Sequence, residues 1–140
     1  MNKKFKIEME QDLEQALNSV EMFNTLGIEI LEYKDGSSVL KMPFDNKLTQ
    51  PMGIMHGGAL FSLADGACAL ALLSILKEKK PFVTAEMKIN YLEPVITGDT
   101  YAYAKVLREG RVVPIEVELK NSDKLVAKAI STYIILDSNK

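Results

Sequence analysis

One run of small and apolar residues, GGALFSLADGACALALLSIL from Gly57 to Leu76, limits the folds open to this chain. Its only charged residue is Asp65. The run is about as long as a membrane span, but a carboxylate at its centre is costly in lipid. A helix that is apolar around its circumference is otherwise stable only when it is buried. The run therefore predicts a central helix covered by the rest of a globular domain.

Length and composition fit one globular domain over residues 1–140. The chain is 47% hydrophobic and 26% charged, and its net charge of −2 gives no basic footprint for nucleic acid. A single cysteine cannot form an internal disulfide, and the basic N-terminus lacks the apolar run of a secretory signal. We expect a cytoplasmic protein that binds neither nucleic acid nor membrane.

The segments before the central run predict one helix and two strands. Apolar spacing predicts an amphipathic helix over residues 11–26, which Gly27 ends. Residues 28–33 and 38–44 read as strands around the turn KDGS, and residues 45–55 read as a loop.

Four strand-like segments with period-two patterning follow the central run, and they predict an antiparallel meander. Their ranges are 82–95, 99–109, 111–121 and 124–136. The first is expected to turn one face toward the core, formed by Val83, Ala85, Met87, Ile89 and Tyr91. The predicted fold class is α+β, with a sheet curled around the central helix. One helix cannot cover both faces and the edges of such a sheet, so we expect a homodimer.

The segment QPMGIMHGG places glycines where the central helix begins. A helix N-terminus offers unpaired N–H groups and positive partial charge, which suit a carbonyl oxygen that becomes negative in a transition state. One well-aimed donor of this kind contributes roughly 100- to 1000-fold in rate. The alternative is that Gly57 and Gly58 only permit a tight turn into the helix.

Asp65 is either functional or structural. A lone carboxylate on a buried helix costs several kcal/mol unless it is paired or hydrogen-bonded, and retained groups of this kind cluster at functional sites. It could equally bond nearby backbone or hydroxyl groups, or face water at an interface. Asp65 follows His56 by roughly 13 Å along a helix axis. If both act on one small group, the second must come from another subunit.

His56 is the only histidine, and no pair of Cys and His stands at ligand spacing, so we expect no metal site. A serine hydrolase is not supported either, since the chain lacks G-x-S-x-G. His56 could simply orient its loop by hydrogen bonding. We expect Cys68 to serve in helix packing, because apolar surroundings disfavour a thiolate.

The segments HGGALFSLAD and INYLEPVITGD resemble the hotdog-fold acyl-CoA thioesterases of the PaaI-like (phenylacetyl-CoA thioesterase) family. The resemblance covers about residues 20–137. It implies a hotdog fold, in which a curved antiparallel sheet wraps a long central helix. It also implies hydrolysis of acyl-CoA thioesters by homodimers, or by tetramers made of two dimers. Coenzyme A would be part of the substrate, and no separate cofactor is implied.

The resemblance also implies roles for individual residues. The Gly57 N–H would polarise the thioester carbonyl, Asp65 of the opposite subunit would act as general base or nucleophile, and His56 would support the loop. Many relatives carry Asn six residues before the histidine, where this chain has Gln50. Relatives often carry Ser or Thr on the following strand to hold the attacking water. Thr84 fits that position, or is an ordinary strand residue.

Substrate contacts are expected near the helix start, where Gly58 allows close approach. Candidates for an apolar acyl slot, which could equally be core residues, are Met52, Ile54, Met55, Phe61 and Phe82. The basic residues Lys105, Arg108 and Arg111 surround a predicted hairpin, where they could meet CoA phosphates or simply be solvated.

Two other functions remain open. A hotdog module could bind acyl-CoA without hydrolysing it, as a sensor or carrier, although mere binding does not require a buried carboxylate. A dehydratase or hydratase could pair His56 with Asp65 across a dimer, although a histidine directly before two glycines favours thioester hydrolysis.

Overall fold

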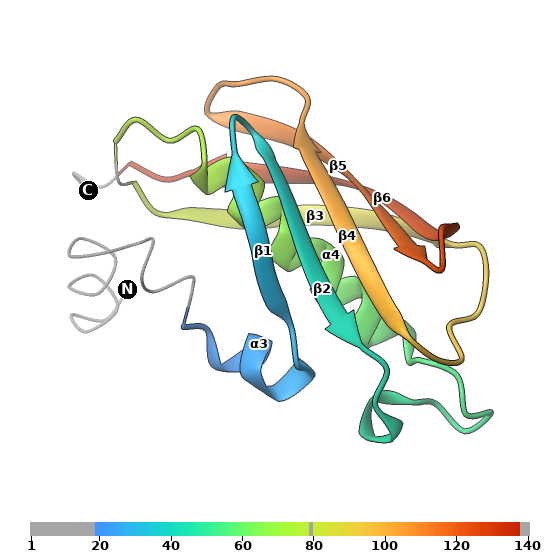
Figure 1. Cartoon of the computed structure of the whole chain (residues 1–140). Coiled ribbons are helices and arrows are strands. Elements are labelled where there is room, and N and C mark those ends of the chain that lie inside the picture. Colours follow the sequence, from blue (N-terminus) through green and yellow to red (C-terminus); the bar gives the residue numbers. More distant parts are fainter. Residues whose placement is uncertain (1–18, 79, 138–140) are drawn as a thin grey trace.

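The computed structural model describes residues 19–78 and 80–137, which form an antiparallel sheet wrapped along one long helix (Figure 1). In chain order the elements are α3 (Glu21–Leu26), β1 (Glu29–Lys34), β2 (Ser37–Pro43), the 3-10 turn η1 (Asn46–Leu48), α4 (Gly57–Leu73), β3 (Phe82–Tyr91), β4 (Asp99–Val106), β5 (Val112–Asn121) and β6 (Lys124–Ile135). The strand order is β1-β2-β4-β5-β6-β3. This architecture confirms the predicted α+β class and the central helix.

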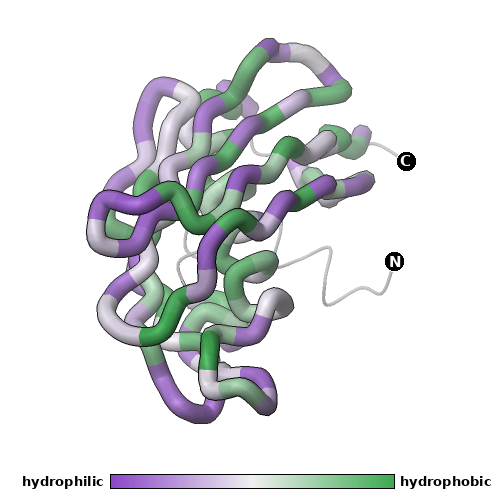
Figure 2. The backbone as a smooth tube through the Cα atoms, turned by 90° about the vertical axis from the view of Figure 1, so that its right-hand side faces the viewer, coloured by the Kyte–Doolittle hydropathy of each residue, from purple (hydrophilic) through white to green (hydrophobic). Residues whose placement is uncertain are grey.

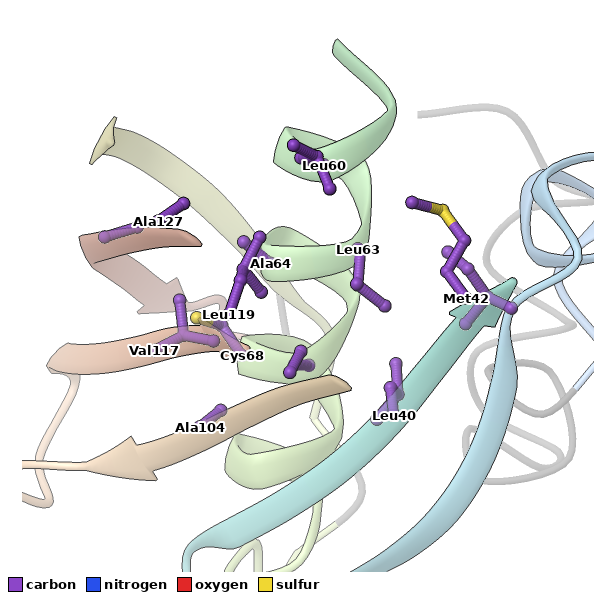
Figure 3. Close-up of a cluster of buried hydrophobic side chains, with 14 of the residues drawn as sticks. Leu40, Met42, Leu60, Leu63, Ala64, Cys68, Ala104, Val117, Leu119 and Ala127 are labelled. Carbon is purple, nitrogen blue, oxygen red and sulfur yellow. The ribbon is translucent and has the colours of Figure 1, made fainter. Parts of the chain in front are cut away.

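The core lies between α4 and the inner face of the sheet. Strand residues alternate between hydrophobic and hydrophilic, whereas α4 is apolar over most of its length (Figure 2). Figure 3 shows the contact from both sides, with Leu60, Leu63, Ala64 and Cys68 on α4 and Leu40, Met42, Val117 and Leu119 on the strands. Each fully buried side chain of this size contributes about 1.5–3 kcal/mol, so the helix is held chiefly by its apolar surface.

The predicted meander is correct for its last three strands and wrong for its first. Strands β4, β5 and β6 follow one another as neighbours, but β3 pairs with β6 at the far edge of the sheet. The connection after β3 cannot be a tight hairpin, because β6 and β5 lie between β3 and β4 and residues 92–98 must cross both. Part of this connection packs against the loop before α4. There the Met55 N–H donates to the Val95 carbonyl at 2.9 Å, and the Val95 side chain is 1% exposed.

A β-bulge in β3 overturns the predicted inner face of that strand. Thr84 pairs with Tyr133 and Glu86 pairs with Thr132, so Ala85 is the extra residue. A bulge reverses the faces on its two sides. Val83 is consequently 43% exposed, whereas Thr84 contacts α4. The prediction therefore holds for Met87 and Ile89, which pack against the core, and fails for Val83 and Ala85. Tyr91 is 48% exposed and reaches α4 through its hydroxyl.

The short helix α3 packs against the middle of α4. Gly27, with φ 74°, ends α3 as predicted. The helix predicted over residues 11–26 is wrong for Ser19 and Val20, which precede the helix, and residues 11–18 of the prediction lie outside the described residues. A Cβ on Gly66 of α4 would lie 2.7 Å from the Phe23 ring. Gly66 is therefore required by the close approach of the two helices.

Within residues 19–78 and 80–137, no helix is long and apolar enough to cross a membrane. The helix predicted to reach Leu76 ends at Leu73, and a turn follows.

Candidate active site

The N-terminus of α4 presents one backbone N–H that the described chain does not use. His56 is the N-cap residue, and its Nδ1 accepts the Gly58 N–H at 2.8 Å. Its carbonyl accepts the N–H groups of Ala59 at 3.0 Å and Leu60 at 3.3 Å. Of the four N–H groups that a helix start leaves without an intrahelical partner, only that of Gly57 finds no acceptor among residues 19–78 and 80–137. His56 therefore caps the N-terminus of α4, and this is how it would support the loop.

The loop before α4 is fixed by its own backbone. The His56 N–H donates to the Leu48 carbonyl at 2.8 Å, and the Gln50 N–H donates to the Ile54 carbonyl at 2.9 Å. The Gln50 side-chain oxygen accepts the Met52 N–H. The side-chain NH₂ of Gln50 is therefore the end of its amide that remains for a ligand.

Tyr91 of β3 braces the same helix start. Its hydroxyl donates to the Gly57 carbonyl at 2.7 Å, and a Cβ on Gly57 would lie 3.1 Å from the Tyr91 Cζ. Burial raises the pKa of the Tyr91 hydroxyl, which keeps it a donor. The sequence predicted only that Tyr91 lies on one face of a strand, and its contact with Gly57 becomes visible in the folded structure.

Asp65 is held by two hydroxyls on one of its two oxygens. Thr84 of β3 donates to Oδ1 at 2.9 Å, and the Tyr133 hydroxyl of β6 lies 2.6 Å from the same atom and 2.8 Å from the Asp65 main-chain oxygen. No donor within the described part of the chain reaches Oδ2. The half-buried carboxylate is therefore anchored through Oδ1 and presents Oδ2.

Tyr133 was not recognised from the sequence. It is 2% exposed and packs against the Phe82 ring, with centroids 5.8 Å apart. Burial, and then the negative charge of Asp65, raise the pKa of its hydroxyl well above the usual range. A buried tyrosine needs a hydrogen-bond partner. A Tyr on the inner face of a strand that faces the central helix could therefore have pointed to a polar partner such as Asp65.

Asp65 and the Gly57 N–H lie along one accessible strip of α4 but cannot meet within a chain. The strip consists of the exposed Gly58 and the partly exposed residues Gly57, Phe61, Ser62, Asp65, Ala69 and Leu73. Eight residues of continuous helix separate Gly57 from Asp65, a distance of about 12 Å at the α-helical rise. The structure therefore places both predicted groups on one face and leaves them apart.

The predicted acyl-slot residues occupy different environments. Met55 is a core residue at 3% exposed, and Met52 is 79% exposed at the tip of its loop. Ile54, Phe61 and Phe82 are partly buried. Phe61 lies one turn before Asp65 on α4, and Phe82 packs against Tyr133, whose hydroxyl contacts Asp65.

The basic residues of the β4–β5 hairpin lie at the other end of α4. The Val106 N–H donates to the Gly36 carbonyl at 2.8 Å, and the Gly36 N–H donates to Ser74 Oγ at 2.8 Å. Ser74 follows the last turn of α4. Lys105, Arg108 and Arg111 are exposed there, so the structure does not bring them to Gly57 of the same chain.

No group of three or more His, Cys, Asp or Glu side chains able to hold a metal ion occurs within the described ranges.

Cys68, one turn from Asp65, is expected to be inert in the folded protein. Its side chain is buried, and burial raises the pKa of its thiol to about 12. Only the thiolate reacts, and at pH 8 its fraction is about 1 in 10⁴ for such a thiol. A chromogenic disulfide reagent should thus detect no fast-reacting thiol before denaturation and one per chain afterwards. Fast reaction of the native protein would contradict this burial.

Comparison with known proteins identifies the relatives of this chain. Residues 52–128 match the family model of the thioesterase superfamily. A Saccharolobus solfataricus protein, named provisionally as an esterase, is 37% identical over 126 residues, which cover 89% of this chain and 83% of that protein. The 1,4-dihydroxy-2-naphthoyl-CoA hydrolase of Listeria monocytogenes is 27% identical over 118 residues, covering 83% of this chain and 96% of the relative.

A solved structure supports the same assignment. The Escherichia coli PaaI protein, from the phenylacetic acid degradation operon, superimposes with a TM-score of 0.82 and 26% sequence identity, covering 94% of this chain and 96% of that one. The resemblance to PaaI-like proteins and the expected hotdog fold are confirmed. This chain belongs to the thioesterase superfamily and is a hydrolase with the hotdog fold.

Proposed function

We propose that this protein hydrolyses acyl-CoA thioesters to a free acid and CoA, in a homodimer whose two sites each combine groups from both chains. The observation that carries the proposal is that α4 presents two groups on the same strip, about 12 Å apart. One is the Gly57 N–H, which finds no acceptor in the part of the chain that the structure describes, and the other is the anchored Asp65 carboxylate. A second chain with an antiparallel α4 would set each Gly57 opposite the Asp65 of its partner.

The distribution of surface residues supports this mode of association. β3 is an edge strand beside the accessible strip of α4, and it exposes Val83 and Tyr91 at 43% and 48%. The outer face of the sheet carries charged side chains, including the Lys128–Glu118 ion pair at 3.7 Å, alongside the exposed Tyr103 and Ile130. Pairing through β3 and α4 would cover the apolar residues at this edge of the sheet and leave the charges of the outer face in water. Two such dimers could further associate into a tetramer.

In the proposed reaction, the Gly57 N–H of one chain polarises the thioester carbonyl. Asp65 of the other chain acts through Oδ2 in one of two ways. As a general base it takes a proton from water while the water oxygen attacks the carbonyl carbon; as a nucleophile it attacks that carbon itself and forms an anhydride that water then cleaves. In both routes the carbon–sulfur bond breaks, and CoA leaves as the thiolate before it gains a proton.

The remaining candidates are assigned to substrate binding. The NH₂ of Gln50 and the cap formed by His56 and Gly58 flank the carbonyl site, and Phe61 and Phe82 border an acyl slot beside Asp65, with Met55 supporting the loop from the core. In an antiparallel pair of helices, Arg108 and Arg111 belong to the chain that supplies Asp65. They would lie beyond the Gly57 of the partner, at a distance that the long pantetheine arm of CoA can span.

No metal or added cofactor is required by these steps. We also propose a cytoplasmic location, because a single buried thiol fits a reducing compartment.

The test is CoA release from a panel of aryl-acyl, medium-chain and long-chain acyl-CoA substrates. A thiol reagent can follow it without background, provided that Cys68 is inert as predicted. Release that saturates with substrate concentration supports the proposal, and the panel ranks the acyl groups. Tight acyl-CoA binding without release would instead establish a non-catalytic binding module. Hydration of an enoyl-CoA without CoA release would indicate a hydratase.

A further inference from the structure

We propose that Tyr133 is a positioning residue that, together with Thr84, fixes Asp65 by one oxygen and directs its other oxygen to the substrate. This inference rests on the proposed function. Its basis is the convergence of two hydroxyls on Oδ1, at 2.6 Å from Tyr133 and 2.9 Å from Thr84. Two donors on one oxygen distinguish the two ends of the carboxylate, although the isolated group is symmetric.

The two hydroxyls differ in how firmly they are held. Thr84 lies on the edge strand β3 and is exposed in the single chain, whereas Tyr133 is 2% exposed on β6, between β5 and β3. The Phe82 ring packs against Tyr133 with centroids 5.8 Å apart. The Tyr133 hydroxyl is also 2.8 Å from the Asp65 main-chain oxygen, so it contacts both the backbone of α4 and the Asp65 side chain. Tyr133 is therefore the rigid member of the pair.

Fixing Oδ1 matters because catalysis depends on the direction of Oδ2. A general base or nucleophile must meet its reacting atom within about 3–3.5 Å and in line. Rotation about the terminal torsion of an aspartate is soft. The two hydroxyl bonds restrict that torsion, which would otherwise scatter Oδ2 among unproductive directions.

The variant Tyr133→Phe removes the hydroxyl and keeps the ring contact with Phe82. We expect kcat to fall by about 10- to 100-fold with KM nearly unchanged, because positioning acts on the reacting group and not on substrate affinity. A Tyr101→Phe variant on the outer face of the sheet is the matched control and should leave both constants at wild-type values. A proportional change in both constants, or an unchanged kcat, would overturn the proposal.

A second readout does not depend on turnover. Loss of one of the two bonds to Oδ1 leaves the terminal torsion of Asp65 less restricted. A crystal structure of Tyr133→Phe should therefore show the Asp65 carboxylate in more than one orientation, whereas the wild-type and Tyr101→Phe structures should show one.

Thr84→Val provides a second variant, at an exposed position where folding is not at risk. It should also widen the spread of carboxylate orientations, by a smaller amount. A single, wild-type orientation of the Asp65 carboxylate in both variants would overturn the proposal even if the enzyme is active. A changed orientation in a protein that releases no CoA would refute the proposed function and leave the anchoring of Asp65 intact.

Discussion

Replacing Asp65 with Asn is expected to lower kcat for acyl-CoA hydrolysis by at least about 1000-fold, because an amide can neither accept the proton of water nor attack the thioester. The fold should survive the change. The Asn side-chain oxygen can still accept from Thr84 and Tyr133, which donate to the corresponding atom of Asp65 at 2.9 and 2.6 Å. The NH₂ would then occupy the place of Oδ2.

The measurement is steady-state hydrolysis, with thermal unfolding and size-exclusion chromatography to confirm fold and assembly. Asp123→Asn is a matched control. Asp123 lies in the exposed β5–β6 turn with φ 63°, a conformation that Asn also adopts readily. Near-normal turnover by Asp65→Asn would remove Asp65 from the mechanism.

Replacing Gly57 with Pro is expected to lower kcat by roughly 100- to 1000-fold, the usual contribution of one oxyanion donor. Proline deletes the N–H yet suits the first position of a helix. The residue before it is also compatible, since His56 has ψ 135° and proline requires an extended predecessor. The backbone can therefore accept the substitution that removes the proposed donor.

Gly57→Ala separates the lost N–H from the added bulk. Both substitutions introduce a Cβ, which would lie 3.1 Å from the Tyr91 Cζ and require that ring to shift slightly. Only proline removes the donor. We expect Gly57→Ala to retain most of the activity that Gly57→Pro loses. Equal losses in both variants would assign the effect to the contact with Tyr91 and contradict the role of the N–H.

The sequence was most informative where one residue had to satisfy several constraints. An apolar run with a single carboxylate predicted both the buried helix and the importance of Asp65. Gly27 and the turn residues located the element ends to within a few positions. The spacing of His56 and Asp65 predicted that the two residues cannot meet within one chain, and the continuous helix from Gly57 to Leu73 keeps them apart.

The sequence was least informative where long-range pairing decides the outcome. The bulge at Ala85 depends on the register between β3 and β6, and this register brings Thr84 to α4. Contacts across 68 residues, from Tyr133 to Asp65, and across 34 residues, from Tyr91 to Gly57, have no local pattern. Each of these tyrosines looks like an ordinary strand residue until the fold supplies its partner.

The most direct test of the shared site is subunit exchange between the Asp65→Asn and Gly57→Pro proteins. In a mixed dimer, the intact Asp65 of one chain faces the intact Gly57 of the other, so one of the two symmetric sites is restored. Random exchange of equal amounts makes half of the dimers mixed, and we predict recovery of about one quarter of wild-type activity from two nearly inactive proteins. If mass spectrometry shows that mixed dimers have formed and activity does not return, the two groups do not act together across the interface.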